Sequence, residues 1–190
     1  MKHSLSVEIN NVLLRPVRSD DLESLRNWRN DRQHTKFLSK IDFITTDAQK
    51  AWYENDRINQ DCYTFAVAET HALNRVVGSV ALYGFSGKTA EFGRFLIGDI
   101  EARGRGIGFF GTVLCLYLGF TELGLSSITA HVHEENIAAL KAYLKSGFAV
   151  TQNNGHELEI IVEKDRFLLL HNFLSEIKIT NQSGELYEYY

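Results

Sequence analysis

The chain has 190 residues, of which 44% are hydrophobic and 23% are charged, and its formal net charge is −4 with a pI near 6.0. This composition is typical of a globular protein with one sizeable core, so we expect a single domain over 1–190, with its core at about 11–174 and a tail at 175–190. The negative net charge argues against a nucleic-acid partner bound through bulk charge.

The cysteines and the longest uncharged stretch bear on the cellular setting. Cys62 and Cys115 form no C-x-x-C pair, which favours a reducing compartment and excludes a cysteine zinc site. The N-terminal segment lacks the apolar run of a secretory signal, so a cytoplasmic location is expected. Residues 106–121 carry no charge, but they are fewer than the roughly 18–20 apolar residues of a membrane span, so they predict a buried helix and no membrane partner.

The N-terminal part predicts one strand followed by two helices. Val12–Arg15 is an apolar run that ends at Pro16, which cannot donate to a sheet ladder. Ser19 is then expected to cap a helix whose first turn carries two aspartates. Thr46 and Gln49 form a capping-box pattern, which predicts the start of a second helix.

Three apolar runs in the middle of the chain predict an antiparallel meander. Turn-forming residues separate them at 71–74 and 86–88. The three runs are Thr64–Ala68, Arg75–Tyr83 and Ala90–Ile97.

The remaining chain alternates between helices and strands. The predicted elements are a helix over about 108–123 ended by Gly124, a strand at Ser127–His133, a helix at Asn136–Lys145, and two β runs within Glu157–Leu174. This order predicts an α/β fold of the mixed α+β kind, with helices on both faces of a twisted mixed sheet.

A glycine-rich turn, Arg103-Gly104-Arg105-Gly106-Ile107-Gly108, leads directly into the apolar helix. Glycines leave backbone N–H groups uncovered, and a helix N-terminus attracts anions, so the turn can cradle a phosphate or pyrophosphate. One alternative is a tight turn that needs glycine for geometry alone. Another is a dinucleotide fingerprint, because Gly111 completes G-x-G-x-x-G. However, residues 99–103 separate the preceding strand from the glycines, which disfavours that reading.

Asn136 and Tyr143 are seven residues apart, so they share one face of the predicted helix, with Leu140 between them. Asn136 lies at the helix start, where its amide can reach a ligand or simply cap the helix. Taken alone, Tyr143 is equally consistent with ordinary packing.

Together these segments resemble the GNAT acyl-CoA N-acetyltransferases. The turn matches their Q/R-x-x-G-x-G/A signature as Arg103-x-x-Gly106-x-Gly108, and Asn136-(x6)-Tyr143-x-Lys145-x-Gly147-Phe148 is similar to their second motif. The resemblance covers about 11–174. It implies a GNAT-type domain whose strands at Ala90–Ile97 and Ser127–His133 splay to open an acyl-CoA cleft.

The resemblance also implies acetyl-CoA as cosubstrate, no metal, and direct transfer to a primary amine in a ternary complex. The backbone from Arg103 to Gly108 would hold the pyrophosphate, and Phe95-Leu96-Ile97 would pair with the pantetheine arm. Asn136 would hydrogen-bond that arm. Tyr143 would donate a proton to the leaving thiolate, because a phenol titrates near 10 and a thiol near 8.5 in reference compounds.

The base that deprotonates the amine has two candidates. Glu91 lies on the strand where this family often keeps a base, although a solvent-facing glutamate is the structural alternative. His133 is the second candidate. His131 and His133 alternate along one strand face and could seed a metal site, but no third ligand has convincing spacing.

The acceptor is predicted from the segment Trp28-Arg29-Asn30, which resembles a branch that acetylates nucleotide-linked amino sugars. Arg29 would suit a diphosphate and Trp28 a base or sugar face, with Asn30 beside them. Alternatives are N-terminal acetylation of a ribosomal protein, a small amine such as a polyamine or antibiotic, and a non-catalytic acyl-CoA-binding module. The expected partners are therefore a small-molecule amine, including a nucleotide-sugar, and a second copy of the chain in a homodimer.

Overall fold

The computed structural model describes residues 5–38 and 42–180, and one mixed sheet runs through all of its β structure. The strands lie in the order β7-β8-β6-β5-β4-β3-β2-β1-β9. Their bounds are β1 Ser6–Ile9, β2 Val12–Pro16, β3 Cys62–Glu69, β4 Arg75–Ser86, β5 Thr89–Ile97, β6 Ser127–His133, β7 Ala149–Asn153, β8 Glu157–Glu163 and β9 Lys178–Thr180. The helices are α1 Leu22–Asn30, α2 Thr46–Ile58, α3 Ile107–Thr121, α4 Ile137–Lys145 and α5 Lys164–Leu170, with 3₁₀ turns η1 Ser19–Asp21, η2 Ile100–Ala102 and η3 Leu174–Glu176.

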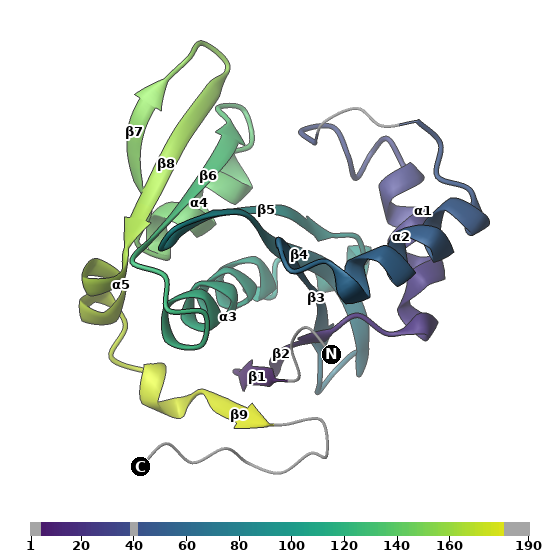
Figure 1. The fold of residues 1–190 in the computed structure, drawn as a ribbon, viewed down its shortest axis with the longest axis horizontal. Coiled ribbons are helices and arrows are strands. Elements are labelled where there is room, and N and C mark those ends of the chain that lie inside the picture. Colours follow the sequence, from purple (N-terminus) through teal and green to yellow (C-terminus); the bar gives the residue numbers. More distant parts are fainter. Residues whose placement is uncertain (1–4, 39–41, 181–190) are drawn as a thin grey trace.

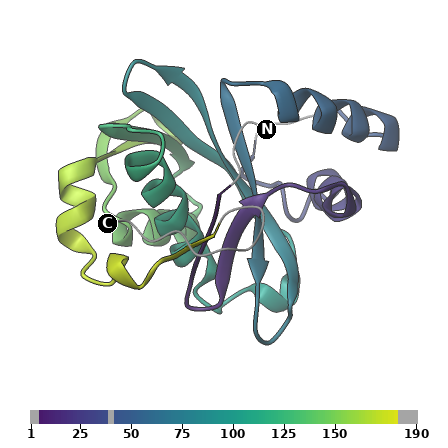
Figure 2. The ribbon, with the colours of Figure 1, turned by 60° about the horizontal axis from the view of Figure 1, so that its bottom comes forward.

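The helices divide between the two faces of the sheet. Figures 1 and 2 show α1 and α2 on one side and α3, α4 and α5 on the other. The main core lies on the α3 side, where ten residues of α3 are buried. A helix that is apolar on all sides belongs in such a place, because both the sheet and α4 cover it. The predicted α/β fold, with helices on both faces of a mixed sheet, is confirmed.

The predicted meander is also confirmed, since β3, β4 and β5 pair antiparallel in sequence order. The next strand, β6, pairs with β5 in parallel over three positions, Thr89–Glu91 with Ser127–Thr129. Beyond Glu91 the two strands separate, while β6 pairs with β8 along its whole length. The predicted splay between these strands is therefore present, and the edge of β5 after Glu91 faces the gap.

A β-bulge interrupts β5 just after the strands separate. Gly93 pairs with Ala81 and Leu96 pairs with Ser79, so two residues of β5 oppose Val80 alone. One of the two, Arg94, has a φ of +52°. Non-glycine residues rarely adopt such a backbone conformation, and a bulge both kinks a strand and re-aims a side chain.

The prediction for the C-terminal part is wrong in one respect. The second β run expected within Glu157–Leu174 is the helix α5, whose Phe167 is fully buried against Phe120 at 5.2 Å between ring centroids. A short apolar run such as residues 167–170 does not distinguish a buried strand from a helix by periodicity. The polar edge strand β7 was not predicted, because four of its five residues are exposed and give no apolar signal.

Three boundaries near the N-terminus also differ from the prediction. Ser19 does not cap α1; instead the Asp21 carboxylate accepts from the Arg18 backbone N–H at 2.7 Å. Thr45, one residue before the predicted position, caps α2 by accepting from the Ala48 N–H. The strands β1 and β9 pair with each other and lie outside the predicted core.

In the described ranges, 5–38 and 42–180, no helix combines the length and apolar character needed to cross a membrane. The remainder of the predicted tail, 181–190, lies outside the described residues.

Candidate active site

The glycine turn presents an open backbone at the N-terminus of α3. Gly104 and Gly106 have φ values of +76° and +77°, which favour glycine. A Cβ on Gly104 would meet no heavy atom within 4 Å, so this glycine is needed for backbone conformation and not for close packing. Along the described chain, no protein carbonyl accepts from the backbone N–H groups of 104–108. These groups can therefore converge on an anion at the positive end of α3.

Ion pairs anchor the chain just before this turn. The Arg75 guanidinium bonds the carboxylates of Asp99, which caps η2, and Glu101, which lies within it, each at 2.7 Å. Arg105 folds back and donates from Nε to the Glu101 carbonyl at 2.7 Å. The hydrogen bonds to Arg75 lower the pKa of Asp99, so the pair is charged at neutral pH.

The helix α4 places Asn136 and Tyr143 as the sequence predicted, one at its start and one on its buried face. Asn136 caps the helix by accepting from the Ala139 N–H at 3.3 Å. Its Nδ2 group has no hydrogen-bond partner within the described segments, so it remains able to donate to a ligand. Asn136 thus serves as a cap and keeps a free donor as well.

Tyr143 is 8% exposed and packs against two phenylalanines, with ring centroids 5.3 Å from Phe92 and 5.8 Å from Phe148. Burial, and to a lesser extent the nearby Cys115 sulfur, raise the pKa of Tyr143 above its ordinary value. The phenol therefore keeps its proton well into the alkaline range. Cys115 is fully buried in α3, and burial raises the pKa of its thiol, so it is not a nucleophile.

Glu91 lies where β5 and β6 begin to separate, and its side chain is on the face opposite to Phe92 and Tyr143. Its Oε1 accepts from the Tyr83 hydroxyl at 2.5 Å and lies 3.6 Å from Nδ1 of His131. Burial, together with the hydrogen bond to Glu91, raises the pKa of Tyr83. Glu91 therefore has a permanent donor on one side and a titratable imidazole on the other, a suitable setting for a proton acceptor.

A pocket of about 900 Å³ opens beside Glu91 on the α1 and α2 side of the sheet. Its size is in the upper part of the range for small-molecule sites. The residues that line it come from α1, the segment before α2, α2 and five strands: Leu25, Arg29, Phe37, Leu38, Ile44, Ala48, Gln49, Trp52, Thr64, Ser79, Tyr83, Glu91, Phe92, Gly93, Arg94, His131 and Glu157.

The three predicted acceptor residues have different surroundings. Arg29 lines the pocket. Trp28 does not, because its ring covers Gly98, where an added Cβ would come within 2.1 Å of it. The Asn30 side chain bonds both the N–H and the carbonyl of Ile44, at 2.8 and 2.9 Å, and so fixes the segment that leads into α2. Only Arg29 of the three is placed to touch a molecule in this pocket.

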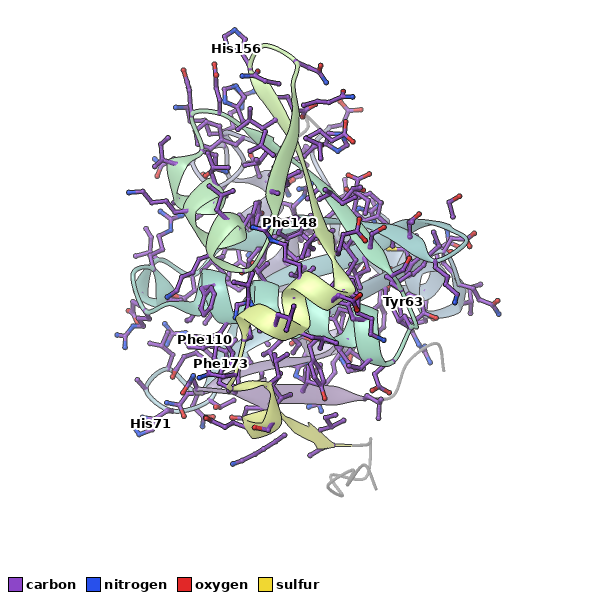
Figure 3. All side chains as sticks on the ribbon, turned by 90° about the vertical axis from the view of Figure 1, so that its left-hand side faces the viewer. Tyr63, His71, Phe110, Phe148, His156 and Phe173 are labelled. Atoms are coloured by element: carbon purple, nitrogen blue, oxygen red, sulfur yellow. The ribbon has the colours of Figure 1, made fainter. Side chains whose placement is uncertain are left out.

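His133, the second candidate base, has packing partners instead of a place beside Glu91. Its ring stacks on His156 at 5.9 Å between centroids and meets Phe37 at 5.3 Å. Its Nδ1 accepts from the Glu135 N–H at 3.2 Å. Figure 3 shows His156 near the tip of the arm formed by β7 and β8. Among the described histidines, cysteines, aspartates and glutamates, no group of three or more is placed to hold a metal ion.

Sequence reasoning did not select three residues that the fold brings to the pocket. His131 was considered only as half of a His-x-His pair, although its place beside Glu91 follows from the parallel pairing of β5 and β6. Tyr83 and Arg94 carried no motif signal. Glu91 and Arg94 are three residues apart, so in a regular strand their side chains would lie on opposite faces. The bulge places them on the same face.

The predicted pantetheine strand, Phe95-Leu96-Ile97, lies on β5 after the bulge, next to the gap. Phe95 packs against Phe92 at 5.8 Å and covers Gly111 of α3. Further along this face, Phe110 and Phe173 lie 6.2 Å apart (Figure 3). The edge of β5 therefore runs from Glu91 toward the glycine turn, with a firmly packed aromatic layer beneath it.

Comparison with known proteins identifies the class of this domain. The acetyltransferase (GNAT) domain family matches residues 11–149, and the chain belongs to this family. The identification of an N-acetyltransferase domain from the sequence is thus confirmed.

Individual relatives are more distant. The chain is 27% identical over 157 residues, 82% of its length, to uncharacterized protein MJ1062 of Methanocaldococcus jannaschii, and spans 31% of that protein. Spermidine N-acetyltransferase from Vibrio cholerae, solved with CoA and spermine, has a TM-score of 0.75 at 22% identity, over 84% of this chain and 99% of that one. FdhC, described as a nucleotide-linked sugar GNAT, has a TM-score of 0.73 at 20% identity, over 92% and 96%. These structural likenesses show the fold.

Proposed function

We propose that the protein transfers the acetyl group of acetyl-CoA to the primary amine of a nucleotide-linked amino sugar, directly within a ternary complex. One observation carries the proposal: the gap between β5 and β6 connects the two faces of the sheet. The glycine turn and Tyr143 lie on the α3 and α4 face, while Glu91 and the pocket lie on the other. A donor and an acceptor can thus approach one reaction centre from opposite sides.

The residues present suit two parts of coenzyme A, the pyrophosphate and the pantetheine arm. The backbone N–H groups of 104–108 would bind the pyrophosphate, and the free edge of β5 at 95–97 would pair with the pantetheine amides. The Nδ2 group of Asn136 would donate to the same arm. Bound in this way, the coenzyme supplies an activated acetyl thioester.

The proposed chemistry needs three proton transfers. A primary amine whose pKa lies above neutrality arrives protonated, so Glu91 takes one proton before or during attack on the thioester carbonyl. As the new C–N bond forms and the C–S bond breaks, the electron pair passes to sulfur, and the nitrogen gives its second proton to solvent. Tyr143 protonates the departing thiolate, and its raised pKa keeps that proton available. Neither buried cysteine takes part in the transfer.

The pocket supports a large acceptor with an aromatic group. Trp52 and Phe37 line it and offer faces on which a nucleobase can stack, and Arg29 offers a guanidinium for a diphosphate. The volume of about 900 Å³ exceeds what a free monosaccharide needs. A polyamine, a peptide N-terminus and a non-catalytic role are the competing functions. We place the reaction in the cytoplasm, as the two free, buried cysteines favour.

A thiol-release assay with acetyl-CoA tests the proposal. The acceptors are a UDP- or dTDP-linked amino sugar, a peptide that begins with serine, and spermidine. We expect coenzyme A release with the nucleotide-sugar alone, unchanged in Arg166→Gln, a charge control on the far helix α5. Release with only the peptide or only spermidine would identify one of those acceptors. Tight coenzyme binding without release from any acceptor would favour a binding module.

A further inference from the structure

We propose that Arg94 and Arg29 together bind an anionic group on the acceptor, so that the enzyme selects amines that also carry a phosphate or a carboxylate. This inference rests on the proposed acetyl transfer, and it adds a specificity-determining residue, Arg94, to the pocket. Four observations lead to it: the direction of the Arg94 side chain, its support, the absence of a neutralising partner, and the position of Glu91.

The bulge in β5 turns Arg94 into the pocket. In a regular strand, residues 92, 94 and 96 would share one face. Here Phe92 and Phe95 share the α3 face, since their rings are in contact. The extra residue therefore places Arg94 on the same side as Glu91 and Gly93, and all three line the pocket. The chain adopts a left-handed φ at a non-glycine residue to reach this arrangement, a form of local strain that is common at functional sites.

The guanidinium of Arg94 is held in position before any ligand arrives. It lies 4.5 Å above the centroid of the Tyr83 ring, and its Nη1 lies 3.4 Å from the Cys62 sulfur. These contacts orient the planar group without neutralising its charge. Tyr83 also donates its hydroxyl to Glu91, so one side chain fixes the relative positions of the candidate base and the cation.

Arg29 brings a second positive charge from α1 to the same pocket. Both guanidiniums belong to side chains that line this pocket, and burial, followed by the charge of Arg94, lowers the pKa of Arg29. No described carboxylate forms an ion pair with either of them. By contrast, Arg15, Arg57 and Arg75 each pair with an acid. Two cations that line one pocket and form no ion pair with a described carboxylate are a suitable receptor for an anion.

The charges of the pocket therefore match an acceptor with two opposite charges. Its ammonium group would face Glu91, and its anion would face Arg94 and Arg29. Spermidine would bring only positive charge to this pair, and a neutral amino sugar would leave it unneutralised. The shared chemistry is an oxyanion, which a nucleotide diphosphate or a sugar carboxylate can supply.

Isothermal calorimetry with UDP, inorganic pyrophosphate and glucuronate tests this inference without acetyl transfer. The variants are Arg94→Asn and Arg94→Gly, because asparagine and glycine both accept the left-handed φ and remove the charge. We expect UDP and pyrophosphate to bind the wild type and to bind either variant about 10- to 100-fold more weakly, as for the loss of a charge-assisted hydrogen bond. Arg94→Lys should keep part of the wild-type affinity for UDP. The distant control Arg166→Gln, which retains Arg94, should bind UDP as tightly as the wild type.

Each outcome decides a separate point. Equal binding of UDP to the wild type and to both neutral variants, with unchanged thermal unfolding, overturns the inference, as does binding of none of the three anions. Glucuronate as the ligand that depends on Arg94 supports the oxyanion site with a carboxylate source. In the assay of acetyl transfer, Arg94→Asn should raise the KM of the anionic acceptor with little change in kcat. If no amine is acetylated yet UDP affinity depends on Arg94, the proposed transfer fails and the anion site remains.

Discussion

The two faces of the sheet at β5 are built in different ways. On the α3 and α4 face, the proposed coenzyme side takes its groups from one continuous stretch of chain, 95–143: the edge of β5, the glycine turn, Asn136 and Tyr143. On the opposite face, the pocket collects residues from Leu25 to Glu157. Binding to a common coenzyme can therefore be encoded in a compact motif, whereas recognition of a particular acceptor depends on how distant segments pack together.

The two faces also differ in their chemistry. The proposed coenzyme side would use backbone N–H groups and a buried phenol whose pKa is raised. The proposed acceptor side would use charged side chains, Arg29, Glu91 and Arg94, which line one pocket. Substitutions on the coenzyme side should thus affect every acceptor equally, while those on the acceptor side should distinguish among acceptors.

The largest expected effect is that of Gly106→Asp. Gly106 caps α3 with a φ of +77°, so an aspartate there would be strained and would place a negative charge where we propose that the pyrophosphate binds. We expect the Kd of acetyl-CoA to rise by about 100-fold or more, since each 1.4 kcal/mol is worth roughly tenfold. Calorimetry with coenzyme A measures this.

The matched control is Gly155→Asp. Gly155 has a similar φ of +83° and, like the turn glycines, is exposed, but it lies in the connection between β7 and β8. An aspartate there carries the same strain and charge away from the cradle, so coenzyme affinity should be unchanged. Equal losses in the two variants would mean that strain alone, and not the anion cradle, explains the effect.

The next effect is that of Glu91→Gln. Without the carboxylate, the amine must lose its proton to solvent, so kcat/KM at pH 7 should fall by about 100-fold, the lower end of typical general base contributions. The deficit should shrink as pH rises toward the pKa of the amine, because the free amine fraction increases about tenfold per pH unit below it. Initial rates between pH 6.5 and 9.5 test this. A deficit that is independent of pH would show that Glu91 is not the base.

The elements that carry the glycine turn, Asn136 and Tyr143, and the order of most other elements, were predictable from the sequence, because their signals are local. The glycine turn, the spacing of Asn136 and Tyr143, and the apolar periods each lie within a few residues of one another. The turn between β1 and β2 also has a local sequence signal, the pair Asn10-Asn11. Both residues have a positive φ, as in a tight hairpin turn, which asparagine adopts more readily than most residues.

The acceptor side was less predictable, because its geometry depends on contacts between distant residues. The bulge at Arg94 reverses the face that strand alternation assigns to that residue. Trp28 resembles a ligand-binding aromatic residue in sequence, yet Gly98, 70 residues later, provides the flat surface on which it packs. Neither fact follows from a local pattern.

Tyr143→Phe should have a smaller effect than Glu91→Gln. The ring contacts with Phe92 and Phe148 are kept, so coenzyme affinity should not change. A thiolate with a conjugate acid pKa near 8.5 is a fair leaving group without help, so kcat should fall by only about tenfold. The effect should be similar for every acceptor. Because the pKa of Tyr143 is raised, the phenol keeps its proton up to pH 10. The wild-type kcat should therefore show no decrease below that pH from deprotonation of Tyr143. Tyr117→Phe, a change of the same kind on α3, serves as the control.

The smallest effect is expected for Arg75→Gln, which acts on the coenzyme side from outside the cradle. Arg75 joins Asp99 and Glu101, but its side chain is 47% exposed, so solvent and salt screen the pair, and exposed ion pairs contribute little. Losing it frees η2 and, through the Glu101 carbonyl, the Arg105 side chain. We expect the KM of acetyl-CoA to rise by about two- to threefold at low salt, with kcat and the KM of the acceptor unchanged.

The difference in the KM of acetyl-CoA between the wild type and Arg75→Gln should disappear near 1 M salt, where the Debye length is about 3 Å. A change in the KM of the acceptor would mean that the two faces of the sheet are coupled through η2. It would contradict the expectation that substitutions on one face leave binding on the other unchanged.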